Sequence, residues 1–124
     1  MFVATQRNDV RVRGCFTLSQ SAILLGELPN AIKKKLPRYP DVPVTLLGRL
    51  AVDGSAQGTG LGAVMLGDAC RRATAVASEV ASVGVLVDAI DENAARFYEH
   101  FGFVALSAAC GRLFLPMGTI ERAL

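Results

Sequence analysis

Residues 50–66 read LAVDGSAQGTGLGAVML and place an apolar strand, a glycine-rich loop and an Ala/Leu-rich helix in direct succession. Gly58, Gly60 and Gly62 have no Cβ atom, so a phosphate can come close to the backbone of this loop. The helix that starts here presents unpaired N–H groups that carry a partial positive charge. The stretch therefore predicts a binding site for a diphosphate.

The loop differs from two common phosphate motifs. It has no Gly-Lys-Ser/Thr, so it lacks the lysine and the magnesium-binding hydroxyl of a P-loop. It also departs from the dinucleotide motif Gly-x-Gly-x-x-Gly, whose third glycine would stand at Ala63. A dinucleotide site and a plain strand-to-helix turn stay open as alternatives at this point.

A second segment narrows these alternatives. Residues 91–103 read DENAARFYEHFGF, follow an apolar strand expected at Val83 to Ile90, and predict a short helix closed by Gly102. The pattern Gln57-x-x-Gly60-x-Gly62, followed by Asn93 to Tyr98 and Phe101-Gly102-Phe103, resembles the acetyl-CoA loop and C-terminal motif of the GNAT superfamily of N-acetyltransferases. The resemblance covers residues 44–117.

The resemblance implies an α+β (mixed α/β) fold with one mostly antiparallel central sheet flanked by helices, and acetyl-CoA as co-substrate. Loop amides would bind the diphosphate, the preceding strand edge would pair with the pantetheine arm, and Asn93 would hold the pantetheine. Tyr98 would protonate the departing CoA thiolate as the catalytic acid, which suits a phenol with a pKa of about 10. The expected cofactor-binding residues are Leu50, Val52, Gln57, Gly58, Gly60, Gly62, Ala63 and Asn93.

Two shorter segments, residues 47–53 and Arg112 to Met117, resemble sequences of the acetyltransferase toxins of bacterial toxin–antitoxin pairs. Members of that branch acetylate the amino group of aminoacyl-tRNA. Membership would imply a ribbon-helix-helix antitoxin as partner, and we expect a homodimer. Acetylation of a small amine or a protein N-terminus, and a non-catalytic CoA-binding protein, are the alternatives. The last is suggested by a chain that starts almost inside its first hairpin, without the helices that wall the acceptor side in the family.

Positive charge is concentrated in the N-terminal part of the chain, although the whole chain has a net charge of +2. Residues 1–49 contain eight Lys/Arg and three Asp/Glu, whereas residues 50–124 contain five and eight. Such a cluster is either a solvated surface or a contact with the phosphates of tRNA. The candidate RNA-binding residues are Lys33, Lys34, Lys35, Arg38 and Arg49.

Length and composition fit one domain spanning residues 1–124. The chain is 52% hydrophobic, but no apolar run reaches the roughly 18 residues of a membrane span. No secretion signal is recognisable at the N-terminus, so we expect a cytoplasmic protein. Cys15, Cys70 and Cys110 lack metal-ligand spacing and are expected to be buried small side chains, with no metal bound.

Hydrophobic periodicity predicts further elements besides the motifs. Strands are expected at residues 2–5, 10–19, 44–52, 104–107 and 113–117, and helices at 29–35, 61–77 and 119–124. No strong general base is evident among Asp53, Asp88 and His100. An acceptor α-amino group, with a pKa near 8, is partly neutral at pH 7 and needs little help from a base.

Overall fold

The computed structural model describes residues 2–5, 12–34, 36, 40–52, 60–106 and 111–123. Its strands are β1 (Phe2–Thr5), β2 (Val12–Leu24), β3 (Asp41–Val52), β4 (Gly84–Asp88), β5 (Val104–Ala105) and β6 (Arg112–Pro116). Its helices are the 3-10 turn η1 (Leu25–Glu27), α1 (Asn30–Lys33), α2 (Leu61–Val80), α3 (Glu92–His100) and α4 (Met117–Ala123). In this part of the chain, no helix is long and apolar enough to cross a bilayer.

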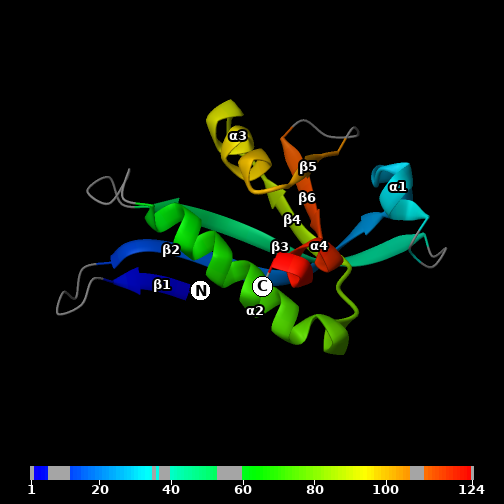
Figure 1. The fold of residues 1–124 in the computed structure, drawn as a ribbon, viewed down its shortest axis with the longest axis horizontal. Coiled ribbons are helices and arrows are strands. Elements are labelled where there is room, and N and C mark those ends of the chain that lie inside the picture. Colours follow the sequence, from blue (N-terminus) through cyan, green and yellow to red (C-terminus); the bar gives the residue numbers. More distant parts are fainter. Residues whose placement is uncertain are drawn as a thin grey trace.

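The strands form one mixed sheet in the order β1-β2-β3-β4-β6-β5. Only β3 and β4 are parallel neighbours, because α2 connects them as a crossover; the other described pairs are antiparallel. In Figure 1, β2 and β3 form a long ladder crossed by α2, while β4 and β6 turn away from it toward α3. The expectation of a mostly antiparallel sheet flanked by helices is confirmed.

Each face of the sheet carries its own hydrophobic cluster. The larger cluster lies under α2 and α4 and includes Leu47, Val85, Val87 and Tyr98. The smaller cluster lies on the opposite face, where Leu86 and residues of the η1–α1 region pack together. The side-chain alternation of β4 therefore assigns Val85 and Val87 to one face and Leu86 to the other.

Several predicted bounds were wrong by a few residues. Strand β2 continues to Leu24 because its last residues pair with the start of β3, where Leu24 faces Asp41. Helix α2 continues to Val80 and stops at Ala81, which adopts φ 55° and donates its N–H to the carbonyl oxygen of Ala77. An alanine in this left-handed conformation gives no sequence signal, since glycine is the usual residue there.

A β-bulge bends β3 at its centre. Thr17 faces Gly48, and Cys15 faces Ala51. Between these two pairs, β3 therefore contains one more residue than β2. The Thr17 hydroxyl donates a hydrogen bond to the carbonyl oxygen of Gly48 at 2.9 Å. Beyond the bulge the alternation shifts by one, and Leu50 packs against the larger cluster.

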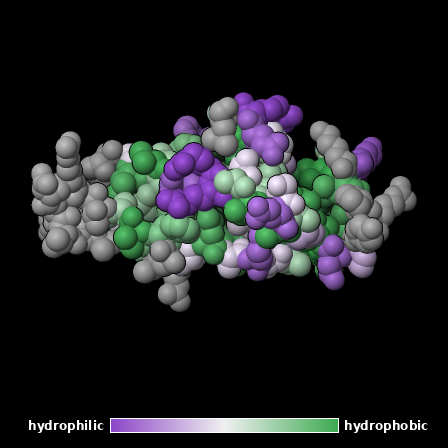
Figure 2. Space-filling view, turned by 90° about the horizontal axis from the view of Figure 1, so that it is seen from below, coloured by the Kyte–Doolittle hydropathy of each residue, from purple (hydrophilic) through white to green (hydrophobic). Residues whose placement is uncertain are grey.

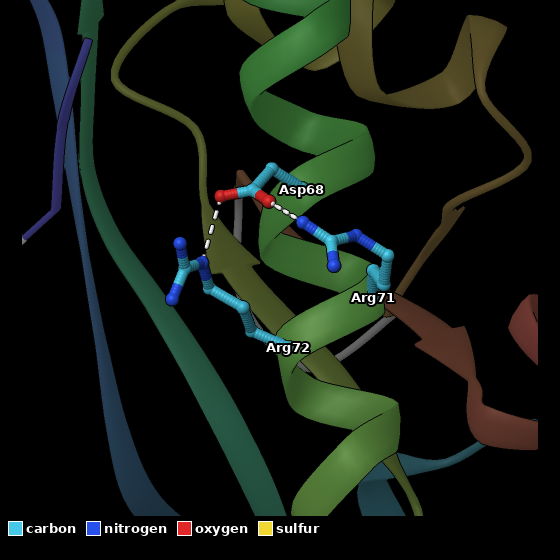
Figure 3. A network of polar contacts seen from close by, with 3 residues as sticks. All are labelled: Asp68, Arg71 and Arg72. Atoms are coloured by element: carbon cyan, nitrogen blue, oxygen red, sulfur yellow. Dashed lines mark hydrogen bonds and ion pairs between the residues drawn. The ribbon is translucent and has the colours of Figure 1, made fainter.

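Charged side chains on α2 form a local network, and one of them contacts β1. Asp68 accepts hydrogen bonds from Arg71 and from the Nε of Arg72 (Figure 3). The guanidinium of Arg72 lies 4.2 Å from the centroid of the Phe2 ring, a cation–π contact. The hydrogen bond from Arg72 lowers the pKa of Asp68, and burial opposes this shift. Figure 2 shows the molecule from below, with strongly hydrophilic side chains next to hydrophobic ones on that face.

The start of β4 is tightly packed. Thr45 and Ser82 share a buried hydrogen bond of 2.9 Å between their hydroxyl oxygens, and the Ser82 hydroxyl also donates to the Gly84 carbonyl oxygen at 3.1 Å. A Cβ on Gly84 would lie 2.5 Å from the carbonyl oxygen of Leu115 and closer still to the Phe114 ring. Only glycine fits at this position.

We expect Gly84→Ala to lower the free energy of unfolding by about 1–3 kcal/mol, because backbone and an aromatic ring must move to admit the methyl group. Urea unfolding followed by circular dichroism measures this change. Gly118→Ala is the matched control, since a Cβ there meets nothing within 4 Å. It should raise stability by about 0.5–1 kcal/mol. Equal stability of the Gly84 variant and the parent would contradict the packing described here.

Candidate functional site

The N-terminus of α2 has the backbone geometry of an anion site. Gly60 precedes the helix with φ 84°, a conformation that favours glycine, and a Cβ built on it meets nothing within 4 Å. The first amides of the helix have no partner within the helix. Of the predicted loop residues, Gly60 is the N-cap of α2, and Gly62 and Ala63 belong to its first turn. Gln57 and Gly58 lie outside the described residues.

Gly62 has a different environment from Gly60. A Cβ on Gly62 would lie 3.5 Å from the Phe97 ring and 3.7 Å from Val52, both ordinary contact distances. Its neighbours therefore bring the first turn of α2 next to α3 and to the end of β3. Both glycines belong to the same sequence motif, but of the two only Gly60 has the positive φ that favours glycine.

A cavity of about 250 Å³ lies where β3 and β4 separate. The two strands pair only from Thr45–Val85 to Leu47–Val87, and then β3 bends at its bulge. The described residues that line the cavity come from β3, from the end of β4 with the loop after it, and from α3. They are Leu46, Leu47, Gly48, Leu50, Asp88, Ala89, Ile90, Ala94 and Tyr98.

Tyr98 reaches this cavity from α3. The helix starts at the N-cap Asp91, whose side chain accepts a hydrogen bond from the Ala94 amide at 2.8 Å, and it closes through Gly102 at φ 98°. Tyr98 is 7% exposed, and the centroid of its ring lies 5.4 Å from that of the Phe103 ring. Burial raises the pKa of Tyr98, so its hydroxyl stays protonated at neutral pH.

Other predicted site residues lie in different places. Leu50 lines the cavity, and its contact with a cofactor arm stays a prediction. Val52 is half-buried near Gly62. Asn93 is exposed on the first turn of α3, and its Oδ1 accepts a hydrogen bond from Arg96 at 2.7 Å. It is absent from the cavity lining, so its role with pantetheine stays a prediction.

The basic residues line a second hollow. Lys33 and Lys34 border a cavity of about 330 Å³ together with Leu25, Asn30 and Leu36. This hollow lies at the η1–α1 region, on the side of the smaller hydrophobic cluster. Lys35, Arg38 and the side chain of Arg49 lie outside what the structure describes.

The candidate bases separate clearly in space. Asp88 lines the same cavity as Tyr98, whereas His100 is exposed and packs edge-on against Phe101, with the ring centroids 5.0 Å apart. Asp53 lies outside the described residues. Sequence reasoning gave Asp88 little weight because an aspartate at a strand end is common. The sequence signal for Asp88 is that it is a charged residue near the end of the apolar segment Val83 to Ile90.

The cysteines agree with a structural role as far as they are described. Cys70 is buried on α2, and burial raises the pKa of its thiol to about 11. Cys15 is half-buried, and Cys110 is outside the described residues. No group of three or more potential metal ligands occurs among the residues with described positions.

Comparisons with known proteins agree with this geometry. The family model described as the acetyltransferase (GNAT) domain matches residues 2–105. A tRNA-acetylating toxin of Mycobacterium tuberculosis is 38% identical over 95 residues, which cover 77% of this chain and 56% of that protein. The chain thus spans little more than half the length of this relative.

Two solved structures are similar to the chain as well. The structure of AtaT complexed with acetyl-methionyl-tRNAfMet superposes with a TM-score of 0.84 at 35% identity, covering 90% of this chain and 66% of that one. A variant of the toxin AtaT bound to the C-terminus of the antitoxin AtaR and acetyl-CoA superposes with a TM-score of 0.74 at 29% identity, covering 91% and 65%.

We expect Gly60→Glu to abolish stabilisation by an anionic CoA ligand, because it places a side chain and a like charge in the open space at the helix start. The measurement is the rise in melting temperature on adding acetyl-CoA, which reports binding to the folded state. Gly60→Asn is the control for backbone strain, since asparagine tolerates the left-handed conformation without adding charge. An equal rise in the Glu variant and the parent would refute the site.

Proposed function

Because this chain belongs to the acetyltransferase (GNAT) domain family, we propose that it transfers the acetyl group of acetyl-CoA to the α-amino group of aminoacyl-tRNA, and so inhibits translation as a toxin. One observation carries the proposal: a buried tyrosine lines a cavity between separating strands, and the open start of α2 lies next to α3 and the end of β3. That arrangement offers separate places for a diphosphate, a thioester and a proton donor.

The cofactor would run from the start of α2 into the cavity. Its diphosphate would bind the first amides of α2 at Gly60, Gly62 and Ala63, where the helix dipole favours negative charge. The pantetheine arm would extend along the β4-facing edge of Leu50, beyond the last paired residue Leu47. Gln57, Gly58, Val52 and Asn93 remain proposed contacts of the same ligand.

Tyr98 would act as the general acid. The neutral amine nitrogen forms a bond to the thioester carbonyl carbon, the carbon–sulfur bond breaks, and the phenol gives its proton to the departing thiolate. The nitrogen then loses one proton to become the amide, and the phenolate takes up a proton through solvent. The raised pKa of Tyr98 keeps this proton in place at neutral pH. Deprotonation of Tyr98 should therefore limit turnover only at a pH above the ordinary tyrosine value of about 10.

Two kinds of support favour aminoacyl-tRNA as the acceptor. The similar proteins include a tRNA-acetylating toxin and the structure of AtaT complexed with acetyl-methionyl-tRNAfMet. Lys33 and Lys34 provide a basic hollow on the face opposite α2 and α4 that suits RNA phosphates. Action on tRNA would place the protein in the cytoplasm. We propose an antitoxin of the ribbon-helix-helix class and a homodimer as its assemblies.

We expect Tyr98→Phe to lower kcat by ~10²–10⁴ with little change in acetyl-CoA affinity, because only the proton donor is removed. Rapid-quench assays with aminoacyl-tRNA and radiolabelled acetyl-CoA measure turnover. The control is Phe97→Leu, which alters the adjacent ring without touching a hydroxyl and should retain most of the activity. Undiminished kcat in the Tyr98 variant would exclude this residue as the acid.

Replacing Lys33 and Lys34 with glutamate should weaken tRNA binding and reduce its dependence on salt. The slope of log K for binding against log salt concentration should become shallower by roughly 0.7 to 0.9 for each phosphate contact that is lost. Binding titrations over a range of salt concentrations measure the slope. The control carries Arg71→Glu and Arg122→Glu, which changes the net charge equally at exposed positions on α2 and α4.

A parent chain that acetylates small amines but ignores charged tRNA would favour the small-amine alternative. Binding of acetyl-CoA without transfer to any amine would favour the non-catalytic alternative. Equal salt slopes for the lysine variant and its control would remove these two lysines from the RNA contact.

A further inference from the structure

The cavity between β3 and β4 has a polar group on each side of the sheet. Among its described lining residues, only Tyr98 and Asp88 carry side-chain oxygens. Tyr98 packs in the larger hydrophobic cluster with Val85 and Val87. Asp88 follows Val87 on β4, so the alternation of the strand turns it toward the opposite face, with Leu86. A reacting group in the cavity would thus have the acid on one side and a carboxylate on the other.

From this geometry we propose that Asp88 binds the amino group of the acceptor, and that Arg112 and Glu27 are positioning residues that hold the Asp88 carboxylate. The inference rests on the proposed function and specifies how its acceptor is recognised. It assigns the amine to the side of the sheet that carries η1 and α1.

Arg112 fixes the carboxylate from the neighbouring strand. It faces Asp88 in the β4–β6 register, and its Nε donates a hydrogen bond to Asp88 Oδ1 at 3.0 Å. That hydrogen bond raises the pKa of Arg112. The Asp88 side chain is still 56% exposed, so the carboxylate has room for a second partner at the cavity mouth.

Glu27 holds the other end of the arginine. Its Oε1 lies 3.9 Å from Arg112, and its Oε2 accepts a hydrogen bond from the Leu24 amide at 2.9 Å. Two carboxylates and one guanidinium leave a net charge of −1 at the mouth. An α-amino group with a pKa near 8 arrives mainly as an ammonium ion, which this charge attracts.

The same 3-10 turn connects the two proposed acceptor contacts. Glu27 ends η1, and Leu25, which begins it, lines the hollow that Lys33 and Lys34 border. An acceptor with an amino group at one end and phosphates beyond it could place the amino group at Asp88 and the phosphates near Lys33 and Lys34. The order of charges, negative at the cavity and positive beside it, matches the order of groups in an aminoacyl-tRNA.

The test compares an alanyl amide of 3′-amino-3′-deoxyadenosine with the matching lactyl amide, which has a hydroxyl in place of the ammonium. Equilibrium binding is measured with CoA in place of acetyl-CoA, so that no transfer occurs. The parent should prefer the alanyl compound by about tenfold or more, as expected for a charge-assisted hydrogen bond. Asp88→Asn should lose this preference, whereas Glu99→Gln, an exposed carboxylate on α3, should keep it.

In turnover assays, Asp88→Asn should raise the KM for aminoacyl-tRNA by a similar factor and leave the KM for acetyl-CoA unchanged. Arg112→Gln should shift the same KM, and the double variant should be no worse than Asp88→Asn alone, because Arg112 acts through Asp88. A merely structural arginine would add its own loss and affect both substrates.

An unchanged preference in Asp88→Asn, or no preference in the parent, would overturn the inference. Loss of the preference supports it even if the parent transfers no acetyl group. Absence of transfer by the parent would contradict the proposed function alone, so the two failures can be told apart.

Discussion

The parallel pairing of β3 with β4 extends over only three residue pairs, and the position of the site depends on this short contact. At one end, the buried hydrogen bond between Thr45 and Ser82 and the close packing at Gly84 hold the strands together. At the other end, the pairing of β3 with β4 stops at Leu47, directly before the bulge in β3. Among the described residues, no residue of β4 pairs with β3 beyond Leu47, and the proposed cofactor arm would bind along this edge.

Elements on opposite faces of the sheet give the gap two chemically different sides. On one side, the open start of α2 lies next to α3, where a Cβ on Gly62 would lie 3.5 Å from the Phe97 ring, and α3 also carries the buried phenol of Tyr98. On the other side, the ends of β4 and β6 carry the ion pair of Asp88 and Arg112. In the proposed transfer, this separation would let each substrate approach from its own face.

The polar residues of the proposed site differ in how deeply they are buried. Tyr98 is buried among aromatic rings, and low solvation keeps its proton bound. Asp88 and Arg112 are more exposed, and their geometry is maintained by strand register and by the link to Glu27. Lys33 and Lys34, on the short helix α1, add charge without deep packing, which suits contacts that depend on long-range attraction.

The sequence by itself determined the strand–loop–helix order around residues 50–66, the helix of Tyr98 and the family, because these depend on local periodicity and on motifs of a few adjacent residues. It also predicted most strands, with errors at ends where pairing with a distant segment decides the length, as for β2 against β3. Only the tertiary structure brought together Glu27, Asp88 and Arg112, which are far apart in the chain. Their contact depends on strand order, register and the bulge, and long-range pairing of this kind leaves no periodic signal in a single sequence.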